Sequence, residues 1–92
     1  MEISIHIEDH ALMRMIERGI EWDLDLHETR KRVFDTVLAG NETPSRHASE
    51  KHTTYVRYFG DGLCFYVICD RYQSPGYVNF VIKTVIIEEG RP

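Results

Sequence analysis

Isoleucine alternates with polar residues at the start of the chain, where Ile3, Ile5 and Ile7 are separated by Ser4 and His6. A period of two is the spacing of one face of a β-strand, and β-branched residues fit that pleated surface. We therefore predict that the chain begins with a strand.

The spacing of the apolar residues changes after Asp9 to that of a helix. The residues that recur at helical spacing, and that we expect to form the core face of this helix, are Leu12, Met15, Ile16 and Ile20. We expect Asp9 to cap the first turn by accepting hydrogen bonds from its free amides. We expect Gly19 to end the helix in a left-handed conformation.

A second helix is predicted to begin between Asp23 and Asp25, because acidic residues are favoured at the positive end of a helix. It is expected to end where Gly40 is followed by Asn41. Its apolar stripe consists of Leu26, Val33, Phe34, Val37 and Leu38. The polar segment 41–50 that follows is expected to be a loop.

Three strand signals fill the rest of the chain. Residues 53–59 form the first, and a Gly-Asp-Gly turn at 60–62 joins it to the nearly continuous apolar run 63–69. We expect this run to be covered on both faces of a sheet. After a second turn at 73–76, residues 77–87 form a long final strand with a bulge or a bend.

The predicted order of elements is therefore β-α-α-β-β-β. Consecutive strands joined by tight turns form an antiparallel meander, and two helices with one apolar stripe each pack on one face of it. We expect an α+β fold in a single domain that spans residues 1–92.

Charge and cysteine content narrow the class of function. A formal net charge of −4 argues against a dedicated, high-affinity nucleic-acid binder, although it leaves room for a local basic site. Cys64 and Cys69 would lie on opposite faces of one strand, so they cannot form a disulfide with each other. The sequence shows no signal-peptide pattern and no membrane-spanning run, so we expect a cytoplasmic protein with no membrane partner.

His10, Arg14 and Arg18 recur every four residues, and a helix would place them on one stripe. A solvated helix face accounts for such a stripe as well as a functional site does. In the functional interpretation, the guanidinium groups bind phosphate oxygens and the imidazole transfers a proton. These are the two functions that RNA cleavage by its own 2′-hydroxyl needs, and no metal ion is required in principle.

Lys83 and Thr84 interrupt the apolar segment VIKTVI of the last strand. Threonine is an ordinary strand residue, whereas a lysine between valines either extends out at a sheet edge or points into a cleft. Tyr55 and Arg57 on an earlier meander strand are suited to stacking on an unpaired base. Lys83, Tyr55 and Arg57 are therefore candidate substrate-binding residues. No pair of histidines or cysteines has zinc-site spacing and no phosphate-binding loop is present, so we expect neither a metal site nor a cofactor.

The string His10-x3-Arg14-x3-Arg18-Gly-Ile resembles the helix motif of the family called domain of unknown function 4258, and the Thr84-Val85 pair resembles the end of its last strand. The order of elements is similar over nearly the whole chain. That family is grouped with the barnase, colicin and RelE-like nucleases.

The resemblance implies a RelE-like fold and a small metal-independent endoribonuclease, belonging to a toxin–antitoxin pair or a mobile element. Its partners would be RNA and a cognate antitoxin. It implies that His10 is the catalytic acid or base, that Arg14 and Arg18 bind or orient phosphate, and that Thr84 contributes to the catalytic site from the last strand.

Two other functions fit the same residues. A non-catalytic protein-binding module or inhibitor, of the kind made by phages or plasmids, would suit the negative net charge. A nucleic-acid binder without chemistry would show salt-dependent affinity for RNA and no cleavage. An enzyme, by contrast, would gather Arg14, Arg18, Lys83 and Tyr55 into one basic concavity. The sequence does not indicate an oligomeric state.

Overall fold

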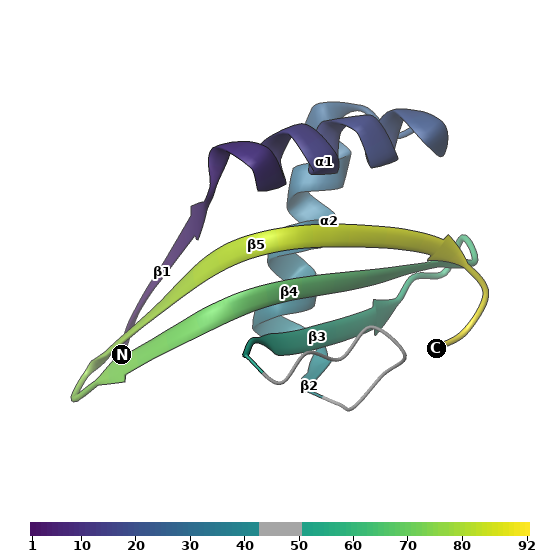
Figure 1. The fold of residues 1–92 in the computed structure, drawn as a ribbon. Helices are drawn as coiled ribbons and strands as arrows, with labels where there is room; N and C mark the ends of the chain where they lie inside the picture. The colour runs from purple at the N-terminus through teal and green to yellow at the C-terminus, as the bar shows by residue number, and fades with distance from the viewer. Residues whose placement is uncertain (43–50) are drawn as a thin grey trace.

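The computed structural model describes residues 1–42 and 51–92, and Figure 1 shows the arrangement of their helices and strands. The elements are β1 (Glu2–Ile7), α1 (Asp9–Glu21), α2 (Leu26–Ala39), β2 (Asn41–Glu42), β3 (Thr53–Tyr58), β4 (Leu63–Ser74) and β5 (Tyr77–Glu89). The predicted α+β class and element order are confirmed, with β2 as a short additional strand. Residues 43–50, the remainder of the predicted loop, lie outside the described residues.

The described strands form one sheet in the order β1-β5-β4-β3-β2. β3, β4 and β5 are antiparallel neighbours, which confirms the predicted meander. Gly62 (φ 92°) and Gly76 (φ 75°) lie in its two turns, and a positive φ angle of this kind favours glycine. β1 pairs in parallel with the outer edge of β5, and β2 pairs with β3 at the opposite edge of the sheet.

The two helices cover the same face of the sheet, which we call the helix face (Figure 1). Alternate residues of β4 point into the main core on this side. The residues between them point to the opposite side, the second face, where Val56, Cys64 and Tyr66 form a smaller cluster. All residues of the run 63–69 are buried. The prediction that this strand is covered on both faces is therefore confirmed.

α1 packs through a different face from the one that we expected. Its buried residues are Ala11, Met15 and Gly19, whereas the side chains of Leu12 and Ile20 are 37% and 67% exposed. The predicted core face is therefore correct for Met15 and wrong for Leu12 and Ile20. The reason is that α1 lies along β5 and touches α2 through a narrow stripe that includes small residues.

Gly19 does not end α1, because the helix continues to Glu21 and the residue with a left-handed backbone is Asp23 (φ 58°). Gly19 instead allows α1 to approach α2 closely. A Cβ atom at this position would lie 2.3 Å from Oγ1 of Thr29, a distance that no packed pair of side chains tolerates.

The cap of α1 also differs from the prediction. The N-cap residue is Glu8 rather than Asp9, and its side chain makes no capping hydrogen bond. The predicted start of the second helix is confirmed, since the Asp25 carboxylate accepts a hydrogen bond from the backbone N–H of Glu28. α2 ends at the predicted position, just before Gly40.

β5 contains the irregularity that its sequence predicts. Ile68 is paired with Thr84 and Cys69 with Ile82, so Lys83 is an extra residue in β5. Such a bulge changes which side chains face the core. Before it the buried residues of β5 are Val78, Phe80 and Ile82, and after it they are Val85 and Ile87.

Candidate functional site

Five polar side chains form a continuous series of contacts where β1 leads into α1 and where β5 is bulged. We call them the charged cluster; in order of contact they are His52, Asp70, Lys83, Glu8 and His10. Asp70 belongs to the alternate residues of β4 that point to the second face. Asp70 therefore lies on the side of the sheet that the helices leave uncovered, whereas His10 belongs to α1 itself.

His52 and Asp70 form the first pair, with His52 Nδ1 2.5 Å from Asp70 Oδ1. The hydrogen bond with His52 is the main reason why the pKa of Asp70 lies below its usual range, and the positive charge of Lys83 lowers this pKa further. Because Nδ1 is occupied by Asp70, Nε2 is the ring nitrogen of His52 left to face other groups.

Lys83 is the centre of the cluster. Its Nζ donates a hydrogen bond to Oε2 of Glu8 at 3.0 Å and lies 3.6 Å from Oδ2 of Asp70. The bond with Glu8 is the main cause that raises the pKa of Lys83 above its usual range, so the ammonium group is charged at neutral pH. The bulge explains the position of the Lys83 side chain. Lys83 is the extra residue of the bulge, so its side chain departs from the regular alternation of β5.

His10 lies at the other end of the cluster, on the first turn of α1. Its Nε2 is 3.7 Å from Oε1 of Glu8, and its side chain is 68% exposed. The exposed Tyr72 places its hydroxyl 3.5 Å from Oδ2 of Asp70, the same oxygen that Lys83 approaches. The cluster thus has an imidazole at each end and an ammonium group in the middle.

The two arginines of the predicted stripe do not join this cluster. Arg14 forms an ion pair with Glu17 on the exposed side of α1, with 3.3 Å between Nη1 and Oε2. Arg18 donates a hydrogen bond from Nη1 to the backbone carbonyl of Val85. Arg18 therefore attaches α1 to β5, in a structural contact that stripe spacing alone does not reveal.

Thr84 and Tyr55 are placed on different sides of the sheet. Thr84 follows Lys83 directly, is half-buried and pairs with Ile68 in the β4–β5 ladder, so it is adjacent to the charged cluster. Tyr55 is buried in the core of the helix face, where its ring packs edge-on against Phe80 at a centroid distance of 5.8 Å. The structure therefore does not bring Tyr55 together with Lys83.

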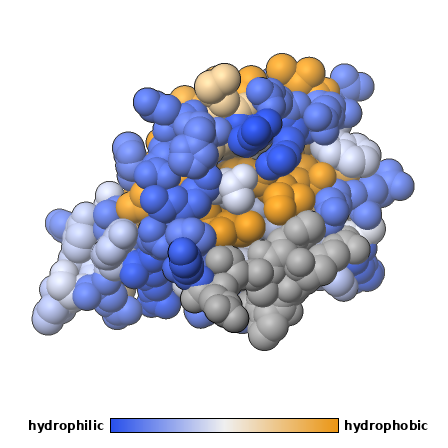
Figure 2. Space-filling model, viewed as in Figure 1, coloured by the Kyte–Doolittle hydropathy of each residue, from blue (hydrophilic) through white to orange (hydrophobic). Residues whose placement is uncertain are grey.

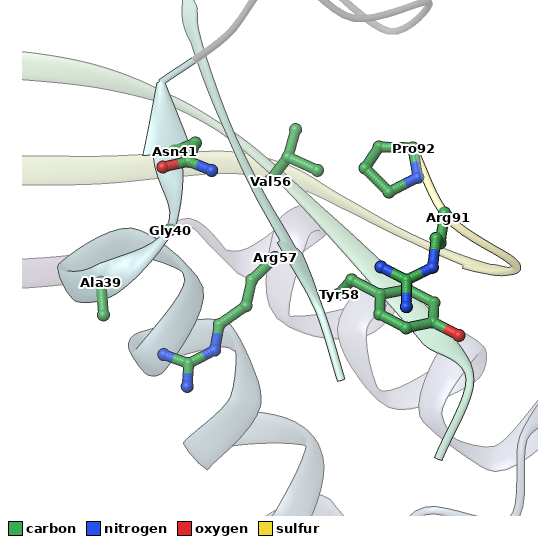
Figure 3. Close-up of a pocket in the computed structure, with 8 residues that line it drawn as sticks. All are labelled: Ala39, Gly40, Asn41, Val56, Arg57, Tyr58, Arg91 and Pro92. Carbon is green, nitrogen blue, oxygen red and sulfur yellow. The ribbon is translucent and has the colours of Figure 1, made fainter. Parts of the chain in front are cut away.

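Arg57 lies at a separate pocket of about 520 Å³ near the end of α2. Its lining residues are Ala39, Gly40, Asn41, Val56, Arg57, Tyr58, Arg91 and Pro92 (Figure 3). In Figure 3 the Arg57 side chain extends toward α2, whereas the Arg91 guanidinium lies over the Tyr58 ring, 4.5 Å from its centroid. The guanidinium carbon of Arg57 lies 5.3 Å from the centroid of the Phe59 ring, a cation–π contact that gives its charge a structural role.

Sequence reasoning did not select Glu8, His52 or Asp70 as site residues. A usable signal was present for Asp70, the first charged residue after the apolar run 63–69. A lysine within an apolar strand needs a nearby counter-charge, and an aspartate at the end of a neighbouring strand can supply it. Glu8 and His52 meet Lys83 and Asp70 only through the fold.

Comparisons with protein-family models, with curated proteins and with solved structures find no match to this chain. Within residues 1–42 and 51–92, no group of three or more histidine, cysteine, aspartate or glutamate side chains is arranged to hold a metal ion. Neither helix in this part of the chain has the length and apolar character needed to cross a membrane.

Proposed function

We propose that this protein is a small endoribonuclease that transfers protons with its own side chains. The observation that carries the proposal is the uninterrupted contact from His52 through Asp70, Lys83 and Glu8 to His10. One imidazole lies at each end of the cluster and an ammonium group lies in the middle. Phosphodiester cleavage needs an acid, a base and a nearby positive charge, and these groups can supply all three. The resemblance to domain of unknown function 4258 and to RelE-like nucleases points to the same reaction.

In this reaction the 2′-hydroxyl of RNA attacks the adjacent phosphorus. A base removes the hydroxyl proton as the new O–P bond forms, and an acid protonates the 5′-oxygen as its bond to phosphorus breaks. The products are a 2′,3′-cyclic phosphate and a free 5′-hydroxyl. Negative charge increases on the phosphate oxygens during the reaction, so a nearby cation lowers the barrier.

The side chains of the cluster suit these three roles. Asp70 holds His52 through Nδ1, which leaves Nε2 to take the proton of the 2′-hydroxyl. Lys83 supplies the positive charge for the phosphate. His10, which Glu8 contacts and solvent reaches, supplies the proton to the leaving oxygen.

The remaining predicted site residues act around this centre. Arg14 is one helical turn from His10 and exposed, so it can exchange Glu17 for the phosphate of a neighbouring nucleotide. Arg18 is a positioning residue, since its bond to Val85 fixes the helix that carries His10. Thr84 is next to Lys83 on the second face and can donate a hydrogen bond to the substrate.

The proposal includes the setting in which such an enzyme would work. An RNA substrate and two buried cysteines that form no disulfide suit the reducing cytoplasm. As the toxin of a toxin–antitoxin pair or as a mobile-element protein, it would need a cognate antitoxin to cover the charged cluster.

The first test is cleavage of a mixed-sequence RNA in the presence of a chelator. We expect products that end in 2′,3′-cyclic phosphate, and no cleavage where a 2′-deoxynucleotide replaces the attacking residue. His52→Ala and His10→Ala should each lower the rate by about 10²–10⁴-fold. Lys31→Ala, on the exposed surface of α2, is the control and should keep the wild-type rate.

A second candidate function is supported by the surface of α1. Leu12, Met13 and Ile20 are exposed there, and Figure 2 shows hydrophobic residues among hydrophilic ones along the upper edge, where α1 lies. With a net charge of −4, this surface suits a protein-binding module or inhibitor. A well-folded protein that cleaves no RNA would favour this function over the endoribonuclease.

A further inference from the structure

The sheet has one long edge that nothing in the described residues covers. At one end, β3 is partly covered by β2. The later half of β5 contacts α1, and Arg18 occupies its Val85 carbonyl. At the other end, β1 pairs with β5 on one side only, and no described strand or helix pairs with its outer side.

The hydrogen bonds of β1 show which of its backbone groups are free. The N–H of Glu2 donates to Gly76, and the N–H of Glu8 donates to Ile82, so the even-numbered residues face β5. In a parallel ladder the N–H and C=O of one residue point to the same neighbour. The N–H and C=O groups of Ile3, Ile5 and Ile7 therefore point outward, away from the sheet.

β1 also lacks three of the features that protect an edge strand, namely lysine, proline and a β-bulge. Its sequence, EISIHI, contains no lysine and no proline, and its pairing with β5 is regular over all six residues. Ile3 is 53% exposed. A strand of this kind is suited to pairing with another strand through its backbone.

We propose that this edge binds the β1 edge of a second copy of the chain, in an antiparallel pair centred on Ser4. In this register Ile3 lies opposite the partner's Ile5, and both residues have outward backbone groups, so they exchange hydrogen bonds. Glu2 lies opposite the partner's His6, an acidic residue against a basic one. Two-fold symmetry repeats each contact, so the strand is complementary to itself.

Charge selects this register over the nearest alternative. A pair centred on Ile5 would also use outward backbone groups, but it would place Glu2 opposite the partner's Glu8. Two carboxylates facing each other are destabilising, and Glu8 is already engaged by Lys83. The proposal does not rest on the endoribonuclease function, because it uses only the backbone and the side chains of β1.

The test is a set of cysteine variants under oxidising conditions. In the proposed register Ser4 meets the partner's Ser4 at a non-hydrogen-bonded position, where Cα atoms are about 4.5 Å apart, within disulfide range. Ser4→Cys should therefore form a covalent dimer on a non-reducing gel. His6→Cys is the control on the same strand, since it faces the partner's Glu2, and should stay monomeric. The natural cysteines are buried and contribute no background.

A second pair of variants tests the backbone contact without disturbing the monomer. Ile3→Pro removes one outward N–H and leaves the ladder with β5 intact, whereas Ile3→Val keeps that N–H. By light scattering at high micromolar concentration, wild type and Ile3→Val should show about twice the monomer mass of 10.8 kDa, and Ile3→Pro the monomer mass. A monomeric wild type, cross-linking of both cysteine variants alike, or an unchanged dimer in Ile3→Pro would each overturn the proposal.

Discussion

The two halves of β5 are held by different neighbours. Up to Ile82 the strand pairs with β1 through backbone hydrogen bonds. After the bulge at Lys83 it has no described strand on that side and instead contacts α1, where Arg18 bonds to Val85. The charged cluster lies at the change from one neighbour to the other. The comparison shows that Lys83 reaches Glu8 because a bulge and a strand–helix junction coincide.

The largest expected effect on stability concerns the packing of α1 against the later half of β5. Met15 is fully buried in the core, so Met15→Ala should lower the free energy of unfolding by about 3 kcal/mol. Leu12→Ala, at a position that is 37% exposed, should cost less than about 1 kcal/mol. Urea denaturation measures both. Equal losses would mean that α1 packs through the face that the sequence alone suggests.

A smaller effect is expected where α1 meets α2. Gly19→Ala should destabilise the fold by about 1–2 kcal/mol, because the clash with Oγ1 of Thr29 outweighs the better helix propensity of alanine. The same substitution in a Thr29→Ala background should be close to neutral, since the obstructing atom is absent. If Gly19→Ala were stabilising in the wild-type background, the close approach of the two helices would be refuted.

The contact between Arg18 and Val85 is expected to contribute about 1 kcal/mol. Arg18→Ala removes a charge-assisted hydrogen bond to a backbone carbonyl. Arg14→Ala removes an exposed ion pair with Glu17 and should change stability very little. Denaturation of both variants therefore separates the structural arginine from the solvent-exposed one, and the idea fails if Arg14→Ala costs more than Arg18→Ala.

The smallest expected effect is the pH dependence that Asp70 gives to stability. Its pKa is lowered in the folded protein, so its contribution is complete above the ordinary carboxyl pKa. It is lost as the pH falls through the lowered folded value. Asp70→Asn should therefore flatten the acid side of the stability curve, measured by denaturation in steps below about pH 4. Glu21→Gln, an exposed change on α1, should leave the curve unaltered.

Much of the fold follows from local patterns in the sequence. Strand alternation, the glycine turns and the acidic residues at the start of the second helix predict the elements and the meander, because each depends on neighbouring residues. The buried face of α1 could not be predicted, since it depends on the close approach of Gly19 to Thr29. The alternating pattern predicts β1 as a strand, but its parallel pairing with β5 is a long-range contact that no local pattern encodes.

The candidate site was predictable only in part, for the same reason. Lys83 was identifiable as a charge in an apolar strand, and His10 as a histidine at the start of a helix. Their connection through Glu8, and the pair of His52 with Asp70, arise from segments distant in the chain. Spacing alone grouped His10 with Arg14 and Arg18, whose side chains make other contacts.

The most direct test of the central claim is the rate of RNA cleavage, in chelator, by wild type and Lys83→Ala. Lys83 is the group through which both halves of the charged cluster are connected. We predict cleavage by the wild type and a loss of about 10²–10³-fold in Lys83→Ala, with Lys31→Ala unchanged. Wild-type cleavage that Lys83→Ala leaves intact, or a folded wild type that cleaves no RNA, would contradict the assignment of this cluster as a catalytic site.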